Sequence, residues 1–184
     1  MINRSDNSHY CIVALTIHWL STVLIISLLG SGFSLGQISN PLMKNDILRL
    51  HFLMGIATLI VTFSRIVWWF HFDKKPDFLE SYPTWQKLSA RIVHFLFYII
   101  ILGMIITGLR MFSLSGAGVQ FLIFGNLEDA LPDFTLYFPR SPHAFGAKLM
   151  MALLLFHASG AIYHHFIKDD DTLRRMWFDS KGRK

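Results

Sequence analysis

Four long apolar runs dominate this 184-residue sequence and limit what it can fold into. They cover approximately residues 11–33, 47–70, 92–112 and 144–167. A run of about 20 apolar residues is long enough to cross a bilayer as a helix. In a water-soluble bundle every helix would need a polar face, and the segment FLFYIIILGM (Phe95–Met104) has none. We therefore expect an all-α membrane protein, a four-helix transmembrane bundle, with a soluble bundle as the lesser alternative.

The distribution of charge predicts how the bundle is oriented. Lys and Arg concentrate on the cytoplasmic side of membrane proteins. If both termini are cytoplasmic, twelve of the 17 Lys and Arg residues lie inside, and residues 168–184 form a charged cytoplasmic tail. The net charge of +5 then reflects topology, so we expect membrane lipid and no nucleic acid as a partner. The length suits a single domain over residues 1–184, and no internal repeat is apparent in the sequence.

Nine histidines stand out in so apolar a chain. An ionisable residue inside a span indicates a functional role. With the predicted orientation, His18 and His157 lie at similar depth near the inner surface, and His51 and His143 lie near the outer surface. His143 and His157 are fourteen residues apart, which places them on one helix face about 21 Å apart. The sequence thus offers two imidazole pairs, the inner pair (His18, His157) and the outer pair (His51, His143).

Two facing imidazoles in an apolar bundle suit a haem with two axial histidines, the form used for electron transfer. Zinc would need further ligands at the same depth, but Cys11 is the only cysteine and we expect all carboxylates in loops or tails. A proton relay is the other alternative to a haem, but it would usually include a carboxylate within a span, and we expect none there. His94 lies at nearly the depth of the inner pair, so it stays open as a replacement ligand or a quinone contact.

Two further residues fit a haem and a quinone near the inner surface. Arg65 follows His51 by fourteen residues and lies at the depth of the inner pair. Haem propionates would supply the anion that a buried arginine needs, and extension of the side chain to the inner surface is an equal alternative. His164 follows His157 by seven residues, on nearly the same face and about 10 Å nearer the cytoplasm. We therefore consider it a candidate quinone contact, with an ordinary histidine at the membrane interface as the alternative.

Several segments resemble those of a known family. These are IHWL (Ile17–Leu20), LHFLMGI (Leu50–Ile56), SPHAFGAKL (Ser141–Leu149) and HASGAIYHHFIKDDDTLRRM (His157–Met176). Together they resemble the bacterial cytochrome b561 family of diheme b-type membrane cytochromes. The resemblance implies a location in the bacterial inner membrane, two haem b groups and electron exchange with ubiquinone. It also implies ligation by His18 with His157 and by His51 with His143. One branch of that family oxidises superoxide at the outer surface.

Three functional hypotheses follow, with no catalytic residue assigned. The first is a diheme cytochrome b, an oxidoreductase that carries electrons between an outer-surface donor, with superoxide favoured, and the quinone pool. The second is a membrane-anchor cytochrome b subunit that transfers electrons between a partner dehydrogenase or hydrogenase and quinone. The third is a haem-free transporter or sensor fragment, which a haem absorption spectrum would exclude.

Overall fold

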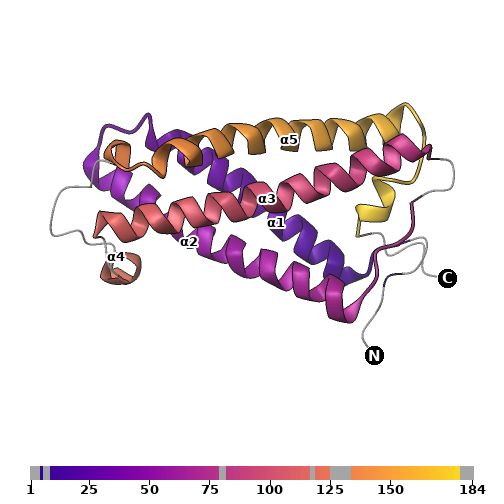
Figure 1. Ribbon diagram of the computed structural model, residues 1–184, viewed down its shortest axis with the longest axis horizontal. Coiled ribbons are helices and arrows are strands. Elements are labelled where there is room, and N and C mark those ends of the chain that lie inside the picture. The colour runs from indigo at the N-terminus through magenta and orange to yellow at the C-terminus, as the bar shows by residue number, and fades with distance from the viewer. Residues whose placement is uncertain (1–4, 6–8, 79–81, 117–118, 125–133, 179–184) are drawn as a thin grey trace.

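Helices are the only regular secondary structure among the described residues (Figure 1). The computed structural model describes residues 5, 9–78, 82–116, 119–124 and 134–178. Its elements are α1 (Ile12–Leu35), α2 (Pro41–Val67), the π-helical turn η1 (Trp68–Phe72), α3 (Thr84–Ser115), α4 (Val119–Phe124), the 3-10 turn η2 (Phe134–Leu136), α5 (Arg140–Phe166) and the 3-10 turn η3 (Arg174–Met176). Within these residues, α1, α2 with η1, α3 and α5 are long and apolar enough to cross a membrane. The predicted all-α fold with four transmembrane helices is confirmed.

Capping groups, and not hydropathy, determine where α2 begins. The side-chain oxygen of Asn40 accepts hydrogen bonds from the backbone N–H groups of Leu42 and Met43, and Pro41 occupies the first helical position. The helix therefore starts well before residue 47, where the apolar run starts. As a consequence Asp46, which we expected in a loop, lies within α2. Helix α3 likewise begins before residue 92.

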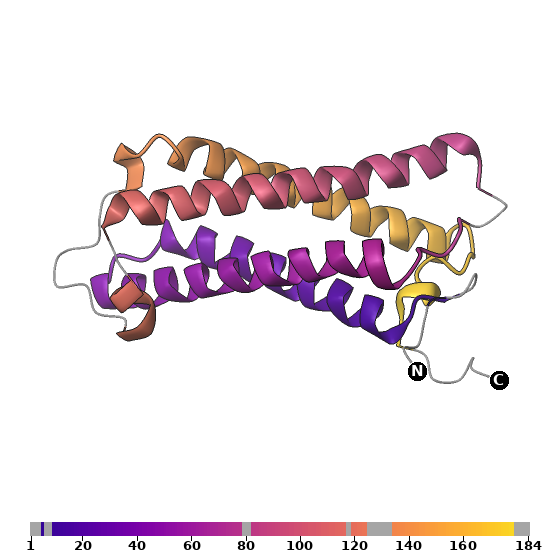
Figure 2. The ribbon, with the colours of Figure 1, turned by 60° about the horizontal axis from the view of Figure 1, so that its bottom comes forward.

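The four long helices form two antiparallel pairs, α1 with α2 and α3 with α5. Figure 2 shows one pair lying over the other, and contacts between the pairs are sparser than contacts within them. Midway along the bundle, Ile25 of α1, Ile101 of α3 and Met150 of α5 form a buried apolar cluster. Met150 lies seven residues from both His143 and His157. Apolar packing therefore separates the two ends of the bundle.

We call the end where α1 and α3 begin the N/C end, because described segments from both chain termini meet there (Figure 1). The hydroxyl of Ser5 donates to Asp73 at 2.6 Å, and Nε1 of Trp19 donates to the carbonyl of Met176 at 2.8 Å. The opposite end, which carries α4 and η2, is the α4 end. Both described chain ends thus lie on one side, as expected for four crossings.

Large apolar side chains cover the outside of every long helix. Phe33, Ile60, Ile106 and Leu155 are each at least 60% exposed, one on each of the four helices. A water-soluble bundle would bury such side chains and turn polar ones outward. The outer surface is therefore suited to lipid, in agreement with the transmembrane interpretation.

Arg49 of α2 anchors the short helix α4. Its Nε donates to the carbonyl of Leu122 at 2.8 Å, and its Nη2 donates to the carbonyl of Ile123 at 2.5 Å. These carbonyls lie in the last turn of α4, which has no further helical partners for them. Phe121 of the same helix is 2% exposed. The arginine and the buried ring together hold α4 against the rest of the bundle.

We expect Arg49→Gln to loosen α4 without unfolding the bundle. Hydrogen bonds from a charged group contribute roughly 1.5–3 kcal/mol, less where water reaches them. Amide hydrogen exchange in α4 should therefore accelerate about tenfold, while exchange in the long helices stays the same. The matched control is Arg110→Gln, which removes one positive charge from another helix. Unchanged exchange in α4 of Arg49→Gln would show that the arginine does not hold this helix.

Candidate haem-binding sites

The inner pair joins α1 to α5 toward the N/C end of the bundle. The ring centres of His18 and His157 are 6.5 Å apart. Trp19 contacts His18 edge-on at 5.6 Å, and Phe97 of α3 contacts His157 edge-on at 5.4 Å. The structure thus brings together the two histidines that depth matching had paired, and it surrounds them with aromatic rings.

The outer pair joins α2 to α5 toward the α4 end. The ring centres of His51 and His143 are 6.3 Å apart. Each ring also meets a hydroxyl of the helix packed beside its own. Nδ1 of His51 lies 2.8 Å from the hydroxyl oxygen of Ser31 on α1, and Nδ1 of His143 lies 3.0 Å from that of Thr107 on α3.

The separation of the rings fits a metal ion held between them. Two imidazoles on opposite sides of one ion, each with a nitrogen about 2 Å from it, have ring centres about 6 Å apart. Both pairs satisfy this condition, and each pair takes one ligand from each helix pair. A haem at either position would therefore fit between the two halves of the bundle, and b-type haem bound by two histidines would serve electron transfer there.

His94 does not suit the role of a ligand opposite His157. Its ring centre is 5.3 Å from that of His157, closer than two ligands of one ion would be. Both residues also belong to the α3–α5 pair, so a metal between them would not bridge the bundle. Nδ1 of His94 donates to the carbonyl of Ala90 at 2.7 Å, in its own helix. His94 thus packs beside the inner pair as a third imidazole.

Two glycines make room for the outer imidazoles. A Cβ atom built on Gly32 of α1 would lie 3.4 Å from Cε1 of His51, and one built on Gly108 of α3 would lie 3.4 Å from Cε1 of His143. Any larger side chain would press on these rings. Neither glycine was identified from the sequence, because the rings that they touch belong to other helices.

The two helix pairs carry polar groups at matching positions, which the sequence had not revealed as a repeat. Ser31 follows His18 by thirteen residues in α1, and Thr107 follows His94 by thirteen residues in α3. Both hydroxyls contact the outer histidine of the partner helix. The match was missed in the sequence because it rests on contacts between helices and not on residue identity.

The same correspondence relates Arg65 to a histidine. Arg65 follows His51 by fourteen residues in α2, and His157 follows His143 by fourteen residues in α5. Arg65 thus takes, in its helix pair, the position that His157 takes in the other. Arg65 therefore lies at the depth of the inner pair. No carboxylate of the described residues forms a salt bridge with it.

His164 lies near the end of α5 in a network of hydrogen bonds. Its Nδ1 is 2.6 Å from a carboxylate oxygen of Asp170 and 3.0 Å from the hydroxyl of Tyr82. Tyr82 also donates to Asp170 at 2.9 Å and contacts the hydroxyl of Thr172. Nδ1 of His164 is therefore occupied, which leaves Nε2 for another partner.

The Asp170 carboxylate remains ionised within this network. Partial burial alone would raise its pKa, but hydrogen bonds from Thr172, His164 and Tyr82 outweigh burial and lower the pKa to about 2. Burial raises the pKa of Tyr82 to about 12, so the phenol keeps its proton. Asp170 is therefore an acceptor for Nδ1–H of His164 at any neutral pH.

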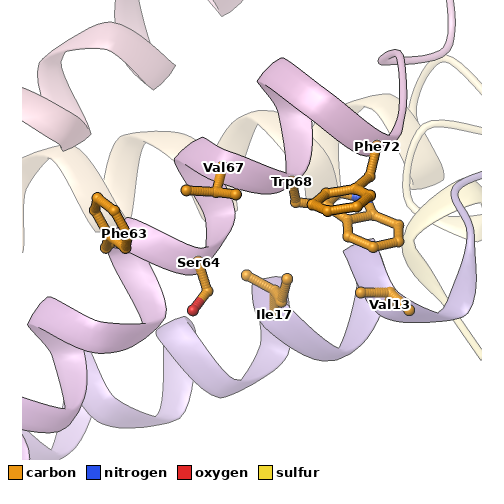
Figure 3. Close-up of a pocket in the computed structure, with 7 residues that line it drawn as sticks. All are labelled: Val13, Ile17, Phe63, Ser64, Val67, Trp68 and Phe72. Carbon is orange, nitrogen blue, oxygen red and sulfur yellow. The ribbon is translucent and has the colours of Figure 1, made fainter.

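A separate apolar groove lies between α1 and α2 near the N/C end (Figure 3). Its volume is about 340 Å³, and Ile17, Ser64 and Trp68 are among the residues that line it. Nε1 of Trp68 is buried and has no hydrogen-bond partner among the described residues. The lining is almost entirely apolar, which suits a hydrocarbon chain of the bilayer.

Comparison with known proteins agrees with the haem interpretation. The family described as "Prokaryotic cytochrome b561" matches residues 9–179. "Cytochrome b561 homolog 1" of Escherichia coli K12 is 28% identical over 87% of this chain and 92% of its own length. "Probable superoxide oxidase CybB" of Yersinia pestis is 28% identical over 94% of this chain and 98% of its own length. With four spans and this match over nearly its whole length, the chain belongs to the prokaryotic cytochrome b561 family, the multi-pass b-type cytochromes that transfer electrons in bacterial membranes.

Proposed function

We propose that the protein is a diheme cytochrome b that carries electrons from superoxide at the outer membrane surface to quinone near the inner surface. The observation that carries the proposal is the pair of matched histidine separations, 6.5 Å and 6.3 Å, each across the two helix pairs. Two sites of equal geometry at different depths provide a route across the membrane. A single haem would use only one of them.

His18 and His157 would hold the inner haem, and His51 and His143 would hold the outer haem. When bound, each haem supplies a one-electron carrier, and two histidine ligands leave no open position for a substrate. The cluster of Ile25, Ile101 and Met150 excludes water from the space between the sites. The protein's own part is thus to position the imidazoles and to keep the route dry.

Arg65 would balance the negative charge of haem propionates at the inner site. A cation within the membrane is costly unless an anion lies close to it. The corresponding position in the other helix pair belongs to His157, which supports the view that Arg65 faces the same space.

The α4 end would face the outside, with both termini in the cytoplasm. This orientation places the basic residues of the η1–α3 connection and of the chain ends inside. Five basic residues remain at or toward the α4 end and can attract a small anion, although nearby carboxylates offset part of this charge. They are Lys44, Arg49, Arg110, Arg140 and Lys148.

Superoxide is the proposed donor because a relative that this chain matches over 98% of that relative's length is named a probable superoxide oxidase. Two superoxide ions would each lose one electron and leave as O₂. One quinone would take up both electrons and two protons to form quinol. The protons would come from the N/C end, where Nε2 of His164 is available while Asp170 holds its Nδ1.

The decisive experiment uses the purified full-length protein in detergent. We expect two haem b groups per chain, their reduction by an enzymatic source of superoxide, and formation of quinol from added ubiquinone. If the purified protein shows no haem absorption, the proposal that it is a diheme cytochrome is wrong. A different result would instead support a membrane-anchor subunit. In that case the protein would contain two haems that superoxide does not reduce, and a larger dehydrogenase would co-purify with it.

A further inference from the structure

The outer imidazoles differ from the inner ones in their hydrogen bonds. The hydroxyl oxygens of Ser31 and Thr107 contact Nδ1 of His51 and His143 at 2.8 Å and 3.0 Å. Rings of the inner pair, in contrast, have no hydrogen-bond partner among the residues that the structure describes. The two sites therefore have similar separations but different surroundings.

Each of the two hydroxyls that contact the outer histidines also lies within hydrogen-bond distance of a carbonyl of its own helix. The hydroxyl of Ser31 donates to the carbonyl of Leu28 at 3.1 Å, and that of Thr107 donates to the carbonyl of Gly103 at 2.7 Å. A hydroxyl has one proton to donate. With that proton directed to the carbonyl of its own helix, the hydroxyl oxygen accepts from the imidazole.

In this arrangement each outer histidine carries its proton on Nδ1. In a neutral imidazole this leaves the lone pair on Nε2, the nitrogen that a metal ion would use. The hydroxyls thus select the tautomer that can bind iron, before any haem is present.

The glycines beside these hydroxyls leave space for the same rings. Gly32 and Gly108 directly follow Ser31 and Thr107, and a Cβ atom built on either glycine would lie 3.4 Å from Cε1 of the ring that the hydroxyl contacts. The hydrogen bond at Nδ1 orients each imidazole, and the glycine leaves its Cε1 edge unobstructed. The same arrangement of a hydroxyl and a following glycine beside an outer histidine occurs once in each helix pair.

We propose that Ser31 and Thr107 are positioning residues of the outer haem that also lower its reduction potential. The proposal rests on the ligand assignment under the proposed function. An imidazole that donates from Nδ1 is a more basic ligand, and a more basic ligand stabilises oxidised iron. The inner ligands lack such acceptors among the described residues, so the difference favours electron flow from the outer to the inner haem.

The test is a redox titration of purified holoprotein that carries Thr107→Val, which keeps the shape of the side chain and removes the hydroxyl. We expect the potential of one haem to rise by about 30–60 mV, a three- to tenfold change in its ratio of oxidised to reduced form. The other haem should keep its potential. The electron paramagnetic resonance signal of the affected haem should shift, because its axial ring is free to turn.

Thr107→Ser is the matched control, because it restores the hydroxyl and should restore the wild-type potential. Ser31→Ala tests the other ligand and should shift the same haem in the same direction, which keeps the test valid if Thr107→Val does not fold. Unchanged potentials in both variants, or equal shifts of both haems, would overturn the proposal. Failure of the ligand assignment is a separate result, seen when His143→Ala retains the haem that Thr107→Val affects.

Discussion

Replacing His157 by alanine is expected to remove the inner haem and to leave the outer haem bound. The variant loses one of the two proposed ligands, the imidazole that lies 6.5 Å from His18 across the two helix pairs. Haem content should fall from about two to about one per chain, and the remaining absorption band should belong to the outer haem. His143→Ala should have the complementary effect.

His94→Ala is the matched control, because it removes a neighbouring histidine that is not one of the proposed ligands. His94 is 5.3 Å from His157 and belongs to the same helix pair, so its loss should leave both haems in place. The inner potential is expected to change only modestly, since a neighbouring ring is lost and no ligand. Retention of two haems in His157→Ala together with loss of one in His94→Ala would transfer the ligand role to His94.

Replacing His164 by glutamine is expected to slow quinone reduction about a hundredfold while superoxide still reduces the haems at the wild-type rate. General acid catalysis by a positioned side chain typically contributes about 10²–10⁴-fold. Glutamine can form hydrogen bonds but cannot act as an acid near neutral pH. Stopped-flow absorption spectroscopy separates the two steps, because haem reduction and haem reoxidation by quinone are observed in sequence.

Asp170→Asn should slow the same step by a smaller factor, about tenfold. The carboxylate, with its pKa of about 2, is ionised throughout the working range and holds Nδ1–H of His164. An amide would accept less strongly and would not stabilise a protonated imidazole. The control is Asp171→Asn, because Asp171 pairs only with the exposed Arg174 at 3.2 Å in the described structure. Normal quinone reduction in His164→Gln would contradict a role for this network in proton transfer.

Sequence patterns predicted the depth of the histidines and their pairing by depth, but not their hydrogen-bond partners. The spacing of His143 and His157 along one helix follows from a repeat of 3.6 residues per turn, so their common face could be calculated. The contacts of Ser31 with His51, and of Tyr82 with His164, join residues of different elements. Rotation and crossing of packed helices set such contacts, and these quantities are not encoded in the period of a single helix.

The helix ends also differ between what the sequence predicted and what the structure shows. Hydropathy located the spans but placed the start of α2 too late, because Asn40 and Pro41 cap the helix outside the apolar run. Once the helix is extended, Asp46 moves from a loop to a helical turn. A cap depends on local hydrogen bonding, whereas a hydropathy run reports only the part of the helix that lipid surrounds.

The sequence by itself determined the all-α membrane fold and the pairing of His18 with His157 and of His51 with His143 by depth. The thickness of a bilayer and the rise of a helix are constant, so position along the chain converts directly to depth. Only the tertiary structure decided that α1 pairs with α2 and α3 with α5, that His94 packs 5.3 Å from His157, and that the two outer imidazoles each meet a hydroxyl. These features depend on close side-chain packing between helices, which the sequence of a single helix does not specify.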